Sequence, residues 1–153
     1  MPYSAEFSEE VKKLLREFGV EELPGRLVFR HEAFWLTTAL EIPENVRVHA
    51  VGVRLIRVQP HGLKPTSFGL MVLGARVRRR RVELSKEELK ELLLGRTLRK
   101  PGLPQGYVAL CFEGEVLGCG EVRGENLRCQ IPLGRRQELL IALAYEERAQ
   151  RLI

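Results

Sequence analysis

The sequence predicts an α+β protein in which a small mixed α/β half precedes a half made mostly of β-strands. Three observations predict this class: an amphipathic pattern near the N-terminus, alternating residues in the middle of the chain, and short apolar runs separated by glycine-containing turns after residue 105. The 153 residues suffice for one ordinary domain or two small ones, and 44% of them are hydrophobic. An abrupt shift in composition at an arginine run places the natural boundary near residue 80.

The N-terminal half opens with a predicted helix. Apolar residues recur at helical spacing from Val11 to Phe18, with Ser8 as the expected N-cap and Gly19 as the stop. Two short β-like runs, 26–30 and 33–38, then flank a polar pair and predict a hairpin.

The middle of the chain contains a longer alternating segment. Residues 46–59 alternate with period two and predict a strand, bent at Gly52. Pro60, Gly62 and Pro65 predict a loop after that strand.

Two apolar segments fit both a strand and a helix. Residues 68–77 are apolar and contain two glycines, and we expect a strand there rather than a short helix. Residues 139–152 close the chain, and we expect a strand over 139–144 that runs into a helical end.

The second half contains the most strongly specified helix. Ser85 and Glu88 form a capping box, three leucines make the apolar face, and Gly95 ends the helix. The strands expected after it span residues 107–112, 116–120, 122–123 and 127–131. Tight turns are expected at 113–114 and 124–126.

The composition excludes several classes of enzyme. All twenty acidic residues are Glu, no Asp occurs, and the bases are nineteen Arg and six Lys. EF-hand loops, the kinase metal site, the aspartic-protease dyad and a Ser-His-Asp triad all need an Asp. With only two Asn, the bias is typical of thermophile-like usage.

No catalytic, metal or cofactor site is predicted, so we expect a protein that is not an enzyme. The three histidines lack ligand spacing, and the three cysteines contain no CxxC pair. The glycines at 118, 120 and 124 resemble a phosphate loop, but short strands flank them and they are interpreted as β-strand glycines. Reduced cysteines and the lack of a signal peptide predict a cytoplasmic protein, and no apolar run is long enough to span a membrane.

The positive charge is concentrated in one segment. Residues 76–100 contain ten bases and four acids, a local charge of +6, so the other 128 residues sum to −1 because the whole chain carries +5. Such a segment is typical of proteins that bind a polyanion. The alternative is a solvated edge strand whose charges discourage aggregation.

The segment from Arg81 to Pro132 resembles a PUA domain, an RNA-binding module. The resemblance lies in the capped helix, the Gly95–Leu98 loop after it, and the strands around the G-x-x-x-G-x-G pattern that starts at Gly114. It implies a β pseudo-barrel in which RNA lies against the helix, the glycine loop and the last strand.

The whole chain resembles ribosome-biogenesis factors built from a pre-PUA and a PUA domain. Residues 1–80 would be the pre-PUA-like α/β domain and residues 81–153 the PUA-like domain. A second resemblance, through residues 84–89, Gly118 and 127–132, is to the C-terminal RNA-binding region of Sun-type rRNA cytosine-5 methyltransferases. The methyltransferase domain of those enzymes is not recognisable in the sequence.

The resemblance implies a set of RNA-binding residues that clamp phosphates of structured RNA. These residues are Arg78, Arg79, Arg80, Arg81, Gly95, Arg96, Thr97, Arg99, Lys100, Arg128, Arg135 and Arg136.

The expected partner is rRNA or tRNA, together with ribosomal precursor particles or an RNA-modifying enzyme. The first hypothesis is a stand-alone factor for ribosome biogenesis and rRNA processing. The second is a detached RNA-recognition subunit of an RNA-modifying enzyme, such as an rRNA or tRNA cytosine-5 methyltransferase. The third is a protein-interaction module whose arginines meet an acidic partner.

Overall fold

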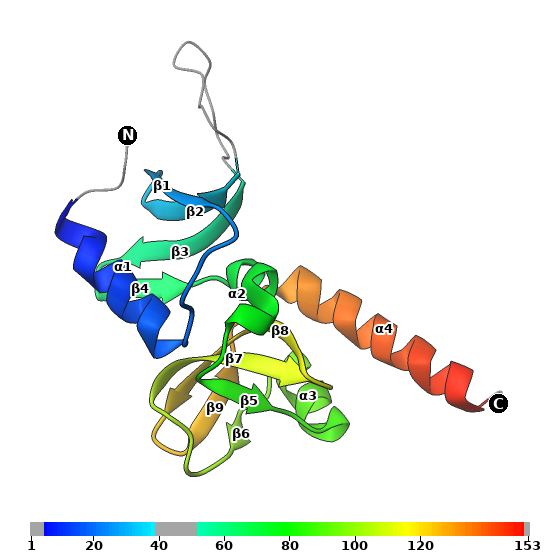
Figure 1. The fold of residues 1–153 in the computed structure, drawn as a ribbon. Coiled ribbons are helices and arrows are strands. Elements are labelled where there is room, and N and C mark those ends of the chain that lie inside the picture. The colour runs from blue at the N-terminus through cyan, green and yellow to red at the C-terminus, as the bar shows by residue number, and fades with distance from the viewer. Residues whose placement is uncertain (1–4, 39–51, 152–153) are drawn as a thin grey trace.

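The computed structural model describes residues 5–38 and 52–151 of the chain (Figure 1). The first half contains α1 (Ala5–Glu17), β1 (Arg26–Arg30), β2 (Ala33–Thr37), β3 (Val53–Gln59), β4 (Gly62–Pro65), α2 (Ser67–Leu73) and the 3₁₀ helix η1 (Gly74–Arg76). The second half contains β5 (Arg81–Glu83), α3 (Lys86–Leu93), β6 (Leu98–Arg99), β7 (Gly106–Phe112), β8 (Glu115–Arg123), β9 (Asn126–Cys129) and α4 (Leu133–Arg151).

The strands form two sheets. Sheet A is an antiparallel meander in the order β1-β2-β3-β4, and sheet B has the order β5-β7-β8-β9-β6. Only the short β5 runs parallel to its neighbour, β7, in sheet B. The predicted α+β class with a partly closed β-barrel in the second half is confirmed.

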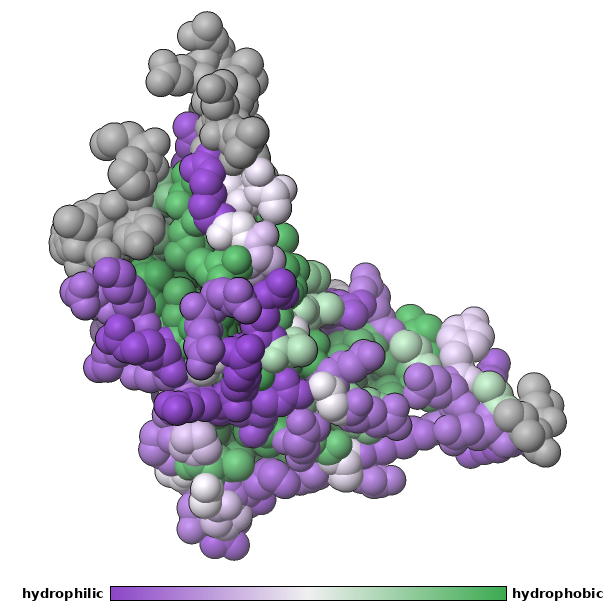
Figure 2. Space-filling model, in the orientation of Figure 1, coloured by the Kyte–Doolittle hydropathy of each residue, from purple (hydrophilic) through white to green (hydrophobic). Residues whose placement is uncertain are grey.

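Strand β7 separates two hydrophobic clusters. Val108 and Leu110 point to the side covered by α3 and α4, whereas Ala109 and Cys111 pack with buried residues of α1, α2 and sheet A. This follows from the alternation of side chains along a strand, and it makes β7 buried on both faces. Figure 2 shows hydrophobic surface over sheet A and mostly hydrophilic side chains around sheet B. The boundary at residue 80 falls between η1 and β5 and stays a prediction.

The first helix is confirmed, but it begins earlier than the sequence indicates. α1 starts at Ala5, so Ser8 lies inside the helix and is not its N-cap. The predicted stop is correct: Gly19 has a φ of 70°, its N–H donates to the Arg16 carbonyl, and the Val20 N–H donates to the Leu15 carbonyl, each at 2.9 Å. This pair of hydrogen bonds is a Schellman motif, which leaves the next residue free to turn into the core.

The predicted hairpins are confirmed. His31 and Glu32 both have positive φ, 50° and 55°, as do Glu113 and Gly114, at 50° and 82°, in the turn between β7 and β8. Two successive residues with positive φ give the type I′ turn that suits the right-handed twist of paired strands.

The strand expected over 46–59 is confirmed from Val53 onward. Residues 46–51 and most of the loop before them lie outside the described residues. The loop predicted at 60–65 is wrong in its second part. Only residues 60–61 form the turn, and Gly62–Pro65 pair with β3 as β4.

In place of the strand predicted over 68–77, the chain forms the short helix α2 over 67–73 and then the 3₁₀ helix η1 over 74–76. The Thr66 hydroxyl caps it by accepting the Gly69 N–H at 2.9 Å. A Cβ on Gly69 would lie 2.8 Å from the Cα of Leu55, so the glycine allows α2 to pack closely on β3. The cap and this close approach decide the conformation, and apolar content alone does not reveal either.

The predicted strand at 139–144 is also wrong, because α4 is continuous from Leu133 to Arg151. Pro132 precedes the helix, and Leu139, Leu140 and Leu143 share the face that packs on the α3 side of sheet B. Among the residues that the structure describes, no helix is both long and apolar enough to cross a membrane.

Candidate nucleic-acid interface

The loop predicted to face RNA begins where α3 ends. The Ser85 hydroxyl accepts the Glu88 N–H at 3.1 Å, and the Glu88 carboxylate accepts the Ser85 N–H at 2.9 Å. At the other end Gly95 has a φ of 86°, and its N–H donates to the Leu92 carbonyl at 2.9 Å. The predicted helix and both its ends are therefore confirmed, and the chain leaves α3 as the loop 95–100.

This loop lies beside the last strand of sheet B. In the pairing of β6 with β9, Leu98 lies opposite Leu127 and Arg99 lies opposite Asn126. The two leucines pack in the cluster under α3, so Arg99 and Asn126 lie on the other face. Arg128, two residues further along β9, is exposed on the same face as Arg99.

The first turn of α4 brings Arg136 to the start of the loop. Its Nη1 atom lies 3.2 Å from the position that a Cβ on Gly95 would occupy. Arg96 and Thr97, which follow Gly95, are both exposed. The structure thus brings together predicted residues from the loop and from α4.

The arginine run 78–81 divides into two pairs. The Nε of Arg80 donates to the Tyr107 carbonyl at 2.7 Å, and the Nη2 of Arg81 donates to the Gly114 carbonyl at 2.7 Å. The two guanidinium groups therefore fix the end of the linking segment and the start of β5 to β7 and to the turn after it.

Arg78 and Arg79 remain at the surface beside the end of α1. Their backbone N–H groups both donate to the Phe18 carbonyl at 3.0 Å. The side chain of Arg78 forms an exposed ion pair with Glu21 at 3.5 Å. Of the four arginines, Arg78 and Arg79 are therefore the two whose side chains are placed to meet a ligand.

Hydrogen bonds connect the arginine run to the loop after α3. Arg80 also donates to the carbonyl of Gln105. The Gln105 side chain bonds both the N–H and the carbonyl of Gly124 at 2.8 Å. The next residue, Glu125, pairs with Arg99 at 2.8 Å, so the run and the loop lie along one rim of sheet B.

Most of the predicted cations have a glutamate partner. The pairs around sheet B are Arg81–Glu83, Arg96–Glu91, Arg99–Glu125, Lys100–Glu88 and Arg135–Glu138. Three others, Arg79, Arg128 and Arg136, have side chains without an ion pair or hydrogen bond to any other described residue. Exposed ion pairs contribute about 0–1 kcal/mol, so a phosphate can displace such a glutamate at small cost.

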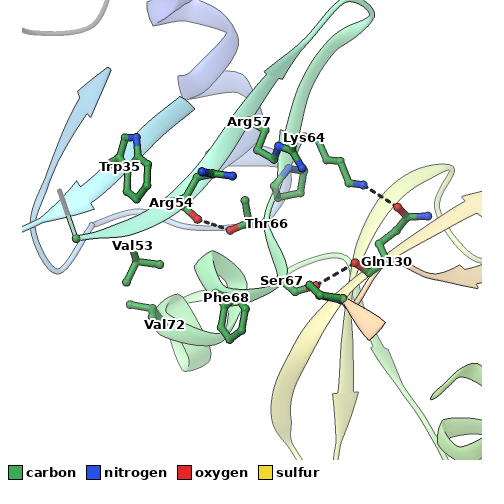
Figure 3. Close-up of a pocket in the computed structure, with 13 residues that line it drawn as sticks. Trp35, Val53, Arg54, Arg57, Lys64, Thr66, Ser67, Phe68, Val72 and Gln130 are labelled. Carbon is green, nitrogen blue, oxygen red and sulfur yellow. Dashed lines mark hydrogen bonds between the residues drawn. The ribbon is translucent and has the colours of Figure 1, made fainter. Parts of the chain in front are cut away.

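A pocket of about 610 Å³, which no pattern in the sequence indicates, lies between sheet A, α2 and the residues after β9. Its lining includes the cations Arg54, Arg57 and Lys64 and the aromatic residues Trp35 and Phe68, whose side chains surround the same space (Figure 3).

A β-bulge creates this arrangement of cations. The register of β2 with β3 shifts after Phe34, so that Leu55 and Ile56 are both buried. As a result Arg54 and Arg57 are both exposed and line the same pocket. In a strand without a bulge, two residues three positions apart would point to opposite faces of the sheet. A period-two pattern assigns the two arginines to opposite faces, and nothing in the sequence indicates the bulge.

The glycines at 118 and 120 lie within β8, as predicted, whereas Gly124 lies in the turn between β8 and β9 with a φ of 61°. Over residues 5–38 and 52–151, no group of three or more His, Cys or Glu side chains is placed to hold a metal ion.

Comparison with known proteins gives a consistent match. Residues 79–137 match the family model described as the methyltransferase RsmF PUA domain. The chain is 29% identical over 146 residues to the ribosomal RNA small subunit methyltransferase F of Shewanella sp. (strain ANA-3), covering 86% of this chain and 30% of that protein. It is 29% identical over 130 residues to the protein of the same name from Shewanella pealeana, covering 81% of this chain and 26% of that protein.

The chain therefore spans less than a third of the length of these curated relatives. The matched part exceeds four fifths of the chain, so it extends beyond residues 79–137 into the first half of the chain. The predicted resemblance to PUA-domain proteins and to Sun-type methyltransferases is confirmed, and the chain carries over residues 79–137 a PUA domain similar to that of the RsmF methyltransferases.

Proposed function

We propose that this chain is the RNA-recognition part of an RsmF-type rRNA cytosine-5 methyltransferase. The observation that carries the proposal is that both halves match rRNA methyltransferases named for the small subunit. It favours the second hypothesis from the sequence over a stand-alone assembly factor. The chain would bind structured RNA, and a catalytic domain acting with it would supply the methyl transfer.

The proposed RNA-binding residues remain those of the sequence-based hypothesis, but the structure suggests different roles for them. Arg79, Arg128 and Arg136 would contact phosphates directly, because no described acid neutralises them. Arg99 and Arg96 would exchange a glutamate for a phosphate, while Arg80 and Arg81 would position the rim through their backbone hydrogen bonds. Guanidinium groups suit this task because their planar fork matches phosphate oxygens.

The proposal places the protein in the cytoplasm, where rRNA is modified. The three cysteines are unpaired thiols, two of them buried, which agrees with a reducing compartment.

Salt-dependent binding to a small-subunit rRNA fragment tests the proposal. Six to eight phosphate contacts predict a log–log slope of about −4 to −7. Replacing Arg79 and Arg128 by Ala should reduce the magnitude of that slope by about 1 for each residue, with Arg148→Ala at the far end of α4 as the control.

A slope near zero, or a double variant that binds like the wild type, would contradict the RNA interface. An acidic protein partner would then explain the basic segment better. Crosslinking in cells separates the targets, because small-subunit rRNA is the expected product and exclusive crosslinks to tRNA would contradict the proposal.

A further inference from the structure

We propose that the pocket beside α2 binds an unpaired nucleotide of the RNA. The base would lie against Phe68 and the guanidinium of Arg54, and a phosphate would lie between Arg57 and Lys64. This inference rests on the proposed function and adds a second contact area, whose four residues precede the segment 79–137 that matches the PUA model.

Two cations lie opposite each other at the edge of this pocket. Arg57 lies directly opposite Lys64 in the ladder of β3 with β4. Like charges directly opposite each other destabilise a sheet. The Lys64 ammonium donates to the neutral side chain of Gln130 at 2.7 Å, and the side chain of Arg57 has no ion pair or hydrogen bond with any described residue.

The lining of the pocket supports an anionic ligand. Among the described residues that line it, three are cations and none is an acid. Several exposed cations elsewhere, such as Arg78, Arg96 and Arg99, have glutamate partners, whereas the three pocket cations form no ion pair with any described residue. A phosphate between Arg57 and Lys64 would remove their repulsion through charge-assisted hydrogen bonds.

Flat side chains lie beside the cations. The Arg54 guanidinium lies 5.0 Å from the centroid of the Trp35 ring, which holds it in place. On the other side Phe68 is 51% exposed on α2 and points into the same space (Figure 3). Phenylalanine rings and guanidinium planes are the surfaces on which unstacked bases of single-stranded RNA lie.

The pocket is also held in shape before any ligand binds. The Ser67 hydroxyl is buried and accepts the Cys119 N–H at 3.0 Å, which fixes α2 to sheet B. Thr66 caps α2 and donates to the carbonyl of Arg54 on β3. A site fixed in this way loses little conformational entropy on binding.

The pocket is large enough for one unpaired nucleotide. A volume of about 610 Å³ accommodates a base with its sugar and phosphate. A paired base within a helix exposes only its edges and cannot present a face to Phe68.

The test compares two RNAs with one stem, a blunt hairpin and a hairpin with a single-stranded tail that carries 2-aminopurine. The wild type should bind the tailed RNA more tightly and quench the 2-aminopurine emission by stacking. Phe68→Ala should weaken binding of the tailed RNA about tenfold and leave binding of the blunt hairpin unchanged.

Replacing Arg57 and Lys64 by Ala should lower the magnitude of the salt slope for the tailed RNA by about 1. The matched controls are Tyr145→Ala, an aromatic residue that is 67% exposed on α4, and Arg148→Ala.

The outcomes separate this inference from the proposed function. Equal binding of both RNAs, unaffected by the pocket variants, overturns the nucleotide site and leaves the PUA interface standing. Binding of neither RNA by the wild type overturns both. Phe68→Leu keeps an apolar side chain without the flat ring, so a folded Leu variant that binds the tailed RNA like the wild type also overturns the site.

Discussion

Gly118 lies where β8 passes under the residues that follow β9, and it leaves no room for a side chain. A Cβ there would be 2.5 Å from Ile131 Cγ1 and 3.0 Å from Ser67 Oγ. Gly118→Ala should therefore destabilise the protein by about 1–3 kcal/mol through overpacking. Urea unfolding measures the change, and Gly134→Ala is the control, because nothing lies within 4 Å of a Cβ at that helical position. Equal stability of the two variants would contradict the packing.

The buried thiols should be inert. Burial raises the pKa of Cys111 to about 11 and the pKa of Cys119 to about 12, and it also raises the pKa of the half-buried Cys129. Because the thiolate is the reactive form, labelling of the first two with Ellman's reagent at pH 8 should be negligible in the native state and complete in urea. Rapid native labelling of two or more thiols would contradict this burial.

Helix α3 provides a pH-dependent prediction at the scale of one element. The hydrogen bond from Lys100, followed by that from the Ser85 N–H, lowers the pKa of Glu88 below its ordinary value. The stabilisation is therefore fully present above the ordinary glutamate pKa and is lost as the pH falls through the lowered pKa. Glu88→Gln should reduce the free energy of unfolding at pH 7 and flatten its dependence on acid pH, as measured by urea titrations.

The cap itself can be tested separately. Ser85→Ala removes the acceptor for the Glu88 N–H and should cost about 1 kcal/mol at neutral pH. Ser85→Thr retains the hydroxyl and serves as the control. A Thr variant as unstable as the Ala variant would assign the loss to something other than the cap.

The elements differ in how far the sequence alone predicts them. α3 is predictable because its cap, its apolar face and its glycine stop all lie within eleven consecutive residues, from Ser85 to Gly95. α2 has only seven residues, too few for a helical period to show, and its cap at Thr66 precedes the apolar run. The leucines of α4 suit a strand as well as a helix in the sequence. Their packing in the cluster under α3, which depends on the tertiary structure, favours the helix.

The two surfaces proposed to bind RNA also differ in how far the sequence predicts them. The loop 95–100 and Arg128 follow from a family pattern, and the structure places them on paired strands. The pocket depends on a bulge in β3 and on an approach between β4 and the residues after β9, and neither is a local property of the sequence. Arg54 and Arg57 are for that reason absent from the predicted set.

The whole molecule should unfold as one cooperative unit. Cys111 and Cys119 from sheet B share a buried cluster with Phe34 and Leu55 from sheet A. The only tryptophan, Trp35, reports on sheet A, while thiol exposure reports on sheet B. The urea midpoints from tryptophan emission and from thiol labelling should coincide. An earlier midpoint for Trp35 would show that the N-terminal half unfolds separately.

The turn between β7 and β8 has a chemical consequence. Glu113 has a positive φ there and precedes Gly114, a position where Asn or Asp fits the backbone more easily. Asn-Gly and Asp-Gly bonds, however, cyclise to a succinimide and degrade, whereas the longer glutamate side chain closes that ring poorly. The tip of the longest hairpin in sheet B thus accepts a small conformational cost and gains resistance to covalent ageing. Peptide mapping after prolonged heating should find this hairpin tip unmodified.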